Sequence, residues 1–364
     1  MKPKRILTSF VATSLLAASC AMPRAEACTR AVYIGEDGTV ITGRSMDWKE
    51  DMQTDLWIFP RGVERNGGAG PDSPSWTSKY GSVIASAYNI ASADGMNEKG
   101  LVANLLYLAE SEYGDDTQDP PMAISFWAQY VLDNFATVDE AVTHLEEHPL
   151  RIVTADLPNG SPATLHLSVS DPSGDSAIFE YVNGKLVVHH GKQYNVMTNS
   201  PVYSQQIALN DYWKTVGGLK FLPGTNRAAD RYVRASFLMD AVTKKLAKNY
   251  IADVPNQTYA NQAVAQTLSV IRGVSVPLGI TTPDQPNIAS TIWRTAADQK
   301  NLVYFFDSAT TPNTFWVRLS EIDFSKDAGF RKLPVAGGKY YAGDATSHFE
   351  KAKPFKFMTV DPGS

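Results

Sequence analysis

Segments with the pattern of β-strands recur along the chain in pairs, and a short polar turn joins the members of each pair. The clearest pair is 29–34 and 39–44, which flank the sequence GEDG at 35–38. Glycine and aspartate are the residues that hairpin turns prefer, and strands joined by such short turns run antiparallel. Two further pairs follow this pattern, with their turns at 94–100 and 171–175: 83–92 with 101–108, and 164–170 with 176–181.

Helical periodicity is grouped between these hairpins instead of alternating with single strands. Apolar stripes at helical spacing occur in 123–135, 138–147, 228–246 and 261–272, and strand patterns return at 289–294, 302–307 and 314–319. This order predicts antiparallel sheets covered by helices rather than a parallel sheet. The sequence contains no proline-rich linker, charge block or internal repeat that would divide it. We therefore predict a single layered domain of the α+β class.

The first residues have the pattern of a secretory signal peptide. Basic residues precede an apolar run over 6–19, and the sequence AEA at 25–27 provides the small residues of a cleavage site. The apolar run is shorter than the roughly 20 residues of a membrane-spanning helix. We predict that residues 1–27 are removed, that the mature domain is 28–364, and that the protein is exported to the periplasm and is not bound to a membrane after processing.

Removal of this segment would make the chain more acidic. It takes away four basic residues and one acidic residue, so the formal net charge changes from −5 to −8. An acidic surface repels the phosphate backbone of nucleic acids and the head groups of anionic lipids. Nucleic acid and membrane surfaces are therefore not expected partners.

The sequence has two cysteines, Cys20 and Cys28. Cys20 could instead be the lipid-modified residue of a lipoprotein signal, although Ala17 stands where such signals prefer a larger aliphatic residue; both routes export the chain. Cleavage before Cys28 would leave one thiol with no disulfide partner. A lone thiol in an oxidising compartment is at risk of oxidation, which favours a functional role for Cys28 over a structural one.

A cysteine at the N-terminus of a mature chain carries its own base. The thiolate is the reactive form, and the pKa of an unperturbed cysteine is about 8.5. The α-amine, with a reference pKa of about 7.7–8.0, can take the thiol proton and later return it to a leaving amine. The first hairpin folds Arg44 and Asp47 back beside Cys28, where a cation can stabilise the thiolate and a carboxylate can orient the α-ammonium. By spacing alone, a surface ion pair explains Arg44 and Asp47 equally well.

Several short motifs lie in order over nearly the whole chain after residue 27. They are CTR at 28–30, GRSMDW at 43–48, DGMNEKGL at 94–101, TNSP at 198–201, LPG at 222–224 and RYVRASF at 231–237. Together they resemble the cholylglycine hydrolase family, which includes penicillin V acylases and conjugated bile salt hydrolases. The resemblance implies the four-layer αββα fold of N-terminal-nucleophile hydrolases and no metal or other cofactor.

The resemblance also implies roles for individual positions. Cys28 is the expected nucleophile and its α-amine the base, with Arg44 and Asp47 beside them. Asn199 matches a residue of the oxyanion hole, whose N–H groups stabilise the negative charge that develops on the carbonyl oxygen. Arg231 matches the second arginine of the site, which supports the charges around the nucleophile.

Tyr107 favours the acylase side of the family. Penicillin V acylases resemble this chain in having tyrosine there, whereas bile salt hydrolases usually have asparagine, and Tyr107 would complete the oxyanion hole. An aromatic residue on a buried strand face is the alternative. The chain also lacks the insert between Asn199 and Leu222 that joins the tetramers of Gram-positive members. It thus resembles the Gram-negative subgroup, which includes penicillin V acylases that also cleave N-acyl homoserine lactones, and a homo-oligomer is left open.

Two tryptophans are candidates for binding the acyl group of a substrate. Trp48 follows Asp47 directly, and Trp76 lies in 62–78, a segment rich in glycine, proline and serine that we predict to be a surface loop bordering a pocket. Either indole could pack against an aromatic or aliphatic acyl group. For Trp76, a role in anchoring the loop is an equal alternative.

The sequence HLEEH at 144–148 is the main competing motif, because it has the form of an inverted zinc-protease site. Its two histidines lie among acidic residues on the predicted outer face of a helix, which favours a solvated surface. We predict an exported N-terminal cysteine amidase that cleaves small N-acyl amides such as penicillin V or N-acyl homoserine lactones through a thioester. A bile salt hydrolase with the same mechanism is the nearest alternative. A zinc hydrolase and an inactive periplasmic binding protein are more remote.

Overall fold

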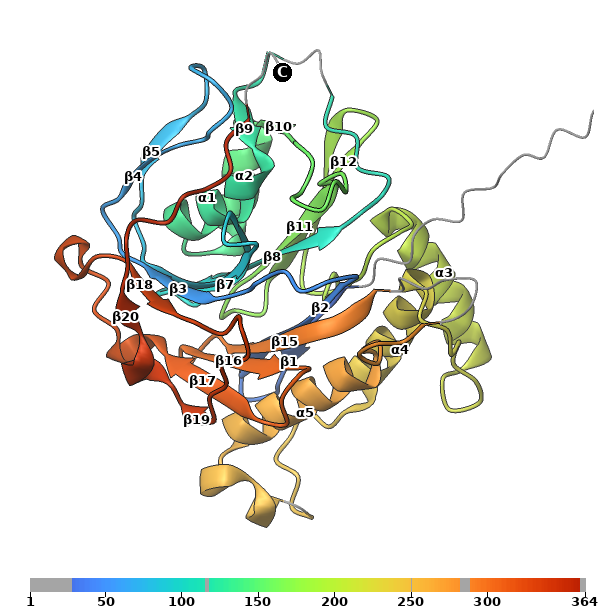
Figure 1. The fold of residues 1–364 in the computed structure, drawn as a ribbon. Coiled ribbons are helices and arrows are strands. Elements are labelled where there is room, and N and C mark those ends of the chain that lie inside the picture. Colours follow the sequence, from blue (N-terminus) through green and yellow to red (C-terminus); the bar gives the residue numbers. More distant parts are fainter. Residues whose placement is uncertain (1–27, 115–117, 250, 282–288, 361–364) are drawn as a thin grey trace, which may run out of the picture.

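Two β-sheets lie face to face in the middle of the molecule, and helices cover the outer face of each sheet (Figure 1). The computed structural model describes residues 28–114, 118–249, 251–281 and 289–360. The layers follow the order helix, sheet, sheet, helix, so the predicted αββα architecture of the α+β class is confirmed. The predicted signal peptide, 1–27, lies outside the described residues.

The first sheet contains the predicted N-terminal hairpin near its centre. Thr29 pairs with Ser45, and Ile34 with Val40, and the second strand continues to Trp48, beyond the predicted end at residue 44. All neighbours in this sheet are antiparallel except the last pair. The strand order is β14 (Val196–Met197), β1 (Thr29–Ile34), β2 (Val40–Trp48), β15 (Ser290–Asp298), β16 (Val303–Ser308), β17 (Thr314–Arg318) and β19 (Gly343–Asp344).

The second sheet is antiparallel throughout and is built from the middle of the chain with two short strands from its end. Its strand order is β13 (Lys185–His190), β12 (Ser176–Val182), β11 (Leu165–Ser170), β8 (Val102–Tyr107), β7 (Ala91–Asn97), β6 (Ser82–Ala87), β3 (Leu56–Phe59), β18 (Arg331–Leu333) and β20 (Glu350–Lys351).

The position of the turn was predicted incorrectly for one hairpin of this sheet. The strand predicted over 83–92 is interrupted after Ala87 by a tight turn in which Tyr88 and Asn89 have φ values of 50° and 54°. The residues 94–97, predicted as a turn, are strand. Their polar side chains are satisfied inside the protein, because Asp94 accepts from Asn104 and Asn97 donates to backbone carbonyls of the neighbouring helix layer. Asp94 and Asn97 were thus predicted as turn residues because they are polar, but both are buried and hydrogen-bonded.

Each sheet is covered by its own helices. On the second sheet lie α1 (Trp127–Asn134) and α2 (Val138–Glu147), and on the first lie α4 (Ala228–Ala241) and α5 (Tyr259–Gly273). α5 approaches β2 very closely: a Cβ placed on Gly43 would be 2.6 Å from Thr267 Cγ2 and 2.8 Å from Ile271 Cγ1. Glycine at this position therefore allows the helix and the sheet to pack.

The helix α3 (Tyr203–Val216), which packs on α4, has no counterpart in the sequence predictions. Its buried positions are Tyr203, Gln206 and Asn210, so its inner face is partly polar and no apolar stripe marks it. The predicted helix 228–246 ends earlier, at Ala241, where Val242 adopts extended backbone angles.

The remaining elements are short. The segment 62–78, predicted as a loop, contains a small hairpin of β4 (Glu64–Asn66) and β5 (Ser75–Thr77). β9 (Pro121–Ala123) pairs in parallel with β10 (Arg151–Val153). The short 3-10 helices are η1 (Ile124–Phe126), η2 (Ile251–Asp253), η3 (Pro255–Gln257), η4 (Leu319–Glu321), η5 (Lys326–Ala328) and η6 (Thr346–His348).

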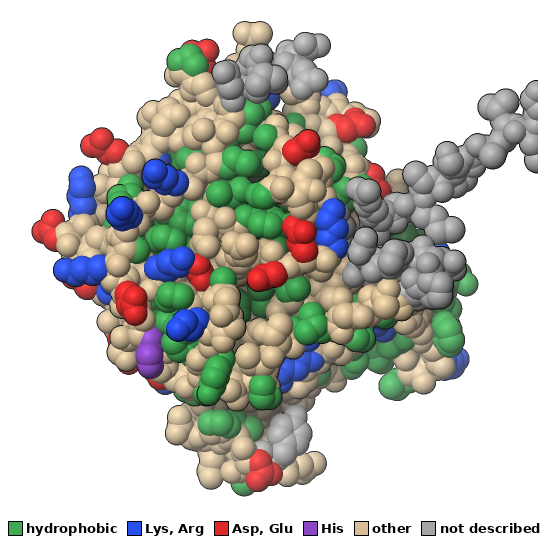
Figure 2. Space-filling view, viewed as in Figure 1, with side chains coloured by type: hydrophobic (Ala, Val, Ile, Leu, Met, Phe, Trp, Pro, Cys, Tyr) green, Lys and Arg blue, Asp and Glu red, His purple; other side chains and the backbone are tan. Residues whose placement is uncertain are grey.

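The surface carries charges of both signs. On the face drawn in Figure 2, Lys and Arg side chains are interspersed with Asp and Glu side chains. Within the described part of the chain, no helix is both long enough and apolar enough to cross a membrane.

Candidate active site

Cys28, the end of β2 and the start of β15 meet at one end of the first sheet. The register places Thr29 opposite Ser45, and Asp47 opposite Thr291 of β15. Because successive side chains of a strand point to opposite faces, β2 presents Arg44 to the space between the two sheets and Gly43 to the helix layer. At this end of the sheet, β2 therefore presents Arg44 on one face and Asp47 on the other.

Cys28 is buried, with 3% of its surface exposed. Its Sγ accepts the backbone N–H of Asp47 at 3.5 Å and lies 3.8 Å from Met46 Sδ. Burial raises the pKa of the thiol, and the nearby Arg44 charge and the Asp47 N–H act against this rise. A thiol in this setting needs a base to become a thiolate, although the surroundings favour the anion once it forms.

Arg44 is fixed by the second sheet. Its guanidinium donates to the carbonyl oxygens of Ala93 and Leu105, each at 2.6 Å, and lies 3.5 Å from an oxygen of the Asp94 carboxylate. Its carbon Cζ is 5.0 Å from the centre of the Trp293 ring. A buried cation held by this many partners keeps one position next to the thiol.

Asp47 has one satisfied and one unsatisfied carboxylate oxygen. The Thr291 hydroxyl donates to Oδ1, whereas Oδ2 is buried and has no hydrogen-bond partner among the described residues. Burial raises the pKa of Asp47 to about 6, against the opposing effect of the Arg231 charge. An unpaired buried acceptor is costly, and it is an acceptor that a neighbouring cation could use.

Arg231 and Asn199 hold the backbone of Cys28 from the helix side. Arg231, one turn into α4, donates from Nη1 to the Cys28 carbonyl at 2.6 Å and from Nη2 to Asn199 Oδ1 at 2.8 Å. Asn199 Oδ1 also accepts from the Cys28 nitrogen at 2.6 Å, and Asn199 Nδ2 donates to the Tyr107 carbonyl at 2.7 Å. The predicted residues therefore meet around Cys28. Arg234, on the same helix, instead donates to carbonyl oxygens of the preceding loop.

The residue before Asn199 is held by a buried pair that the sequence reasoning missed. His166 Nδ1 is 2.9 Å from Glu180 Oε1, and His166 Nε2 is 2.8 Å from the Thr198 carbonyl oxygen. The two contacts tie the end of β14 to β11 and β12, directly before Asn199. A single histidine on a predicted strand gives no sequence signal for this contact.

Arg30 is a second residue whose role was not foreseen. It is fully buried, and its guanidinium donates across the sandwich to the Ser176 hydroxyl at 3.0 Å and to the Val169 carbonyl at 3.2 Å. Burial lowers the pKa of Arg30 to about 10. Arg30 therefore ties β1 to the second sheet two residues after Cys28. The CTR motif contains it, and that was the available signal.

An apolar cavity opens beside the thiol. Its volume is about 60 Å³, and Cys28 and Arg44 lie in its wall. Trp48 forms another part, with its Nε1 donating to the Tyr88 hydroxyl at 2.8 Å and its ring 6.3 Å from that of Tyr107. The rest of the wall is mainly aliphatic: Met46, Met52, Ala87, Ile90, Ala91, Ala93, Leu105, Ile124, Leu157, Ala163, Leu165 and Met358, with Ser92 and Ser125.

Trp76 does not join this cavity. Its Nε1 donates to Asp133 at 2.8 Å, and its ring packs edge-on against Phe126 and Tyr130. The alternative of a loop anchor is the one that the structure supports, and the expected contact with a substrate is corrected. The reason is that Asp133 is buried and needs donors, which Trp76 supplies together with Arg65.

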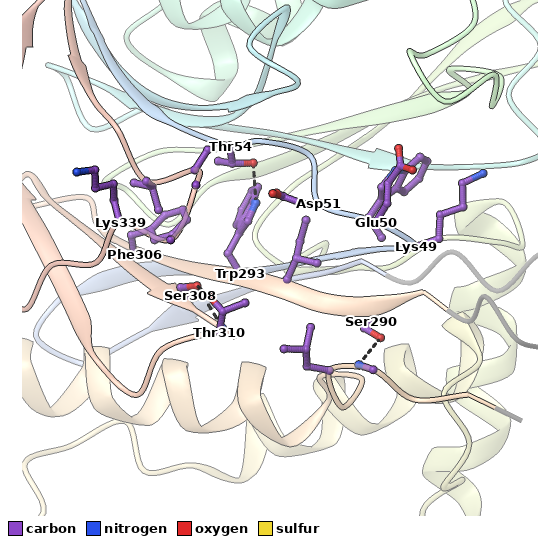
Figure 3. Close-up of a pocket in the computed structure, with 18 of the residues that line it drawn as sticks. Lys49, Glu50, Asp51, Thr54, Ser290, Trp293, Phe306, Ser308, Thr310 and Lys339 are labelled. Carbon is purple, nitrogen blue, oxygen red and sulfur yellow. Dashed lines mark hydrogen bonds between the residues drawn. The ribbon is translucent and has the colours of Figure 1, made fainter.

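A larger cavity of about 640 Å³ lies near Trp48 but does not include Cys28 (Figure 3). Figure 3 shows Trp293 and Thr54 in its middle, Lys49 and Glu50 toward one end and Lys339 toward the other. It is larger than the cavity beside the thiol, but no cysteine occurs among the described residues of its wall. The smaller, apolar cavity is the one that Cys28 borders.

The histidines of the HLEEH motif have other contacts. His144 Nε2 is 2.9 Å from the Tyr130 hydroxyl, and the rings of His144 and His148 are 5.0 Å apart. No group of three metal-binding side chains occurs among the residues that the structure describes.

Comparisons with known proteins agree with this geometry. Residues 28–329 match the family described as linear amide C–N hydrolases, choloylglycine hydrolase family. The chain is 50% identical to a penicillin V acylase from Pectobacterium atrosepticum over 368 residues, covering 97% of this chain and 98% of that protein. It is 30% identical to a bile salt hydrolase/transferase from Clostridium perfringens over 249 residues, covering 60% and 73%.

Solved structures give the same result. The structure of a penicillin V acylase from Agrobacterium tumefaciens superposes with a TM-score of 0.82 at 55% identity, covering 92% of this chain and all of that one. A conjugated bile acid hydrolase from Clostridium perfringens shares the fold, with a TM-score of 0.68 at 21% identity over 87% of this chain and 98% of that one. The chain is therefore a member of the choloylglycine hydrolase family of linear amide C–N hydrolases.

Proposed function

We propose that this hydrolase is exported, is processed so that it begins at Cys28, and cleaves N-acyl amides such as penicillin V and N-acyl homoserine lactones. The observation that carries the proposal is the surroundings of Cys28. The thiol at the wall of an apolar cavity has a buried cation, Arg44, in the same wall, and it accepts the backbone N–H of Asp47, whose buried Oδ2 has no hydrogen-bond partner among the described residues.

Processing would supply what this site lacks. A free α-amine at Cys28 would be the base that the buried thiol needs, and as an ammonium it would be a donor for the unsatisfied Asp47 oxygen. Asn199 would keep the amine oriented through its Oδ1. Asp47 and Asn199 would then hold the amine from two sides.

The reaction follows from these positions. Sγ attacks the amide carbon while the α-amine takes the thiol proton, and the carbonyl oxygen becomes an oxyanion. Asn199 Nδ2 has two N–H bonds, of which one is used by Tyr107, so the second is available to the oxyanion. The ammonium then protonates the leaving amine, a thioester remains on Cys28, and water attacks that thioester to release the carboxylic acid.

The apolar cavity supports the choice of acyl groups. Phenoxyacetyl and alkanoyl groups can bury apolar surface against Trp48, Tyr107 and the aliphatic wall. This chain is similar to penicillin V acylases from Pectobacterium and Agrobacterium, and this similarity favours penicillin V among the candidate substrates. A conjugated bile salt is the second candidate, because a bile salt hydrolase is also a relative.

The test compares amine release from penicillin V, decanoyl homoserine lactone and glycocholate by wild type and Cys28→Ala. We expect wild type to have the higher kcat/KM for the first two and Cys28→Ala to release no amine while keeping the wild-type circular dichroism spectrum. A preference for glycocholate would replace the acylase assignment with the bile salt assignment. Turnover by Cys28→Ala would refute the thioester mechanism.

The N-terminus is tested separately, by mass spectrometry of the purified active enzyme. We expect Cys28 to be the first residue. A variant with one glycine inserted before Cys28 that cannot be removed should fold but release no amine, because its α-amine is displaced from the thiol. Full activity of a chain that retains a residue before Cys28 is incompatible with the proposal.

A further inference from the structure

The last described residues form an arm that lies after the residues matched by the family model. The family match stops at residue 329, and we define residues 352–360 as the C-terminal arm. The arm is extended and runs over the outer side of the second sheet toward α1 (Figure 1). Its backbone is tied at both ends, since Ala352 N donates to Phe330 O at 2.9 Å and Val360 N to Gly68 O at 2.7 Å.

Aromatic side chains fix the arm in place. Phe355 packs edge-on against Trp57 with ring centres 5.0 Å apart, and Phe357 stacks on Phe126 with ring centres 4.2 Å apart. Phe355 is buried, whereas Lys356 between them is exposed. The arm is therefore a packed part of the second hydrophobic core and keeps its residues at defined positions.

Met358 is the residue of the arm that reaches the cavity of Cys28. Its N–H donates to Ile90 O at 2.9 Å, and its carbonyl accepts from Ser125 Oγ at 2.6 Å. Ile90 and Ser125 line the same cavity. The backbone of Met358 is thus held on both sides, and only its side chain is free to adapt.

Met358 and Cys28 stand on different layers of the molecule. Cys28 begins the first sheet, whereas Ser125 and Met358 belong to the layer on the outer side of the second sheet, next to α1. The reacting carbonyl of a substrate must contact Sγ. An acyl group that enters the cavity therefore directs its end away from Cys28, toward the wall that contains Met358.

The cavity beside Cys28 is small for a pocket that binds an acyl group. Its volume of about 60 Å³ is below the roughly 300–1,000 Å³ of usual ligand pockets, so a long acyl group must displace part of the wall. A methionine side chain is unbranched and flexible and fills irregular gaps. Met358 is therefore a part of the wall that can move without unfolding a strand.

We propose that Met358, held by the C-terminal arm, closes the far end of the acyl cavity and sets the length of acyl group that the enzyme accepts. The inference rests on the proposed amidase function. It adds a specificity-determining residue from outside the region that matches the family.

The experiment measures kcat/KM for butanoyl, octanoyl and dodecanoyl amides of both homoserine lactone and 6-aminopenicillanic acid. Met358→Ala should raise the dodecanoyl-to-butanoyl ratio by about tenfold or more, because removal of side-chain atoms opens space for several methylenes. Met358→Trp should lower this ratio by a similar factor. Lys356→Ala, exposed on the same arm, is the matched control and should keep the ratio within about twofold.

The outcomes separate the inference from the function on which it rests. If wild type hydrolyses neither acyl series nor penicillin V, the proposed function fails and the inference with it. If it hydrolyses penicillin V alone, the inference alone is overturned. If wild type hydrolyses a series but both Met358 variants keep its chain-length ratio, the inference alone is overturned. Should Met358→Ala prove unfolded by circular dichroism, Met358→Val makes the same test with a smaller loss of volume, and a smaller shift is expected in the same direction.

Discussion

At the scale of single residues, Asp47 is the group whose ionisation should govern activity in acid. Burial raises the pKa of Asp47 to about 6, and the positive α-ammonium of a processed chain would lower it from there. As the pH falls through the pKa, Oδ2 gains a proton and no longer accepts from the ammonium. We expect kcat/KM to fall about tenfold per pH unit below this point.

Asp47→Asn should remove this acid limb and lower kcat/KM by about tenfold to 100-fold at neutral pH, since a hydrogen bond to a charged group contributes about 1.5–3 kcal/mol. The same substitution should not lower the stability of the folded protein at neutral pH. The folded protein binds the Asp47 proton more tightly than the unfolded chain, so the contribution of Asp47 to stability decreases as the pH rises from about 4 to 6. Urea unfolding at pH 7 should therefore find Asp47→Asn no less stable than wild type. An unchanged acid limb in this variant contradicts the assignment.

Asn199 should act mainly in the transition state. Loss of an oxyanion-hole donor lowers kcat by about 100- to 1,000-fold, so Asn199→Ala should reduce kcat to this extent and change KM by less than about threefold. Steady-state kinetics with penicillin V as the substrate measures both kcat and KM for this variant. Asn134→Ala, whose side chain only bonds the Tyr130 carbonyl on α1, is the control and should keep wild-type kcat. A change confined to KM would make Asn199 a substrate-binding residue only.

At the scale of elements, the contact of β2 with α5 positions the strand that carries Arg44 and Asp47. Gly43→Ala would add a Cβ 2.6 Å from Thr267 Cγ2, and overpacking of this kind costs about 1–3 kcal/mol. We expect the free energy of unfolding in urea to decrease by this amount. Gly224→Ala, with no heavy atom within 4 Å of the added Cβ, should change it by less than about 0.5 kcal/mol.

A second variant tests whether the clash is the cause. Thr267→Ser removes Cγ2 but keeps the hydroxyl that donates to the Ala263 carbonyl. Adding it to Gly43→Ala should therefore recover part of the lost stability. Additive effects of the two substitutions would mean that the loss has another origin, because residues in contact should couple.

At the scale of the whole molecule, export and processing are predicted to be independent of Cys20. A signal peptide cleaved before Cys28 does not need a thiol at residue 20, whereas a lipoprotein signal does. Cys20→Ala should therefore leave the protein in the periplasmic fraction with Cys28 as its first residue, as checked by cell fractionation and mass spectrometry. A membrane-attached wild type that becomes detached by Cys20→Ala would establish the lipoprotein route.

Much of the fold followed from local sequence patterns. The strand β1, the helix α2 and the strands β16 and β17 lie close to their predicted bounds, because apolar periodicity and turn residues act over a few positions. β2 and β15 were also predicted, but each continues beyond its predicted end, to Trp48 and Asp298. The hairpin at Tyr88 and the helix α3 were missed for one reason. Their polar groups are buried and paired inside the protein: Asp94 lies 3.5 Å from Arg44, and Gln206 accepts from the Thr198 hydroxyl. A polar residue in the sequence looks exposed until its partner is known.

The sequence alone determined the set of residues that meet around Cys28. Cys28, Arg44 and Asp47 are neighbours because strand register follows from one short turn, and the motifs that include Asn199 and Arg231 identified the family. Only the tertiary structure decided how these groups are connected: Asn199 bonds Cys28 across 171 positions, His166 holds Thr198, and Met358 closes the cavity. Such contacts depend on how the two sheets and their helix layers pack, and no spacing along the chain encodes that packing.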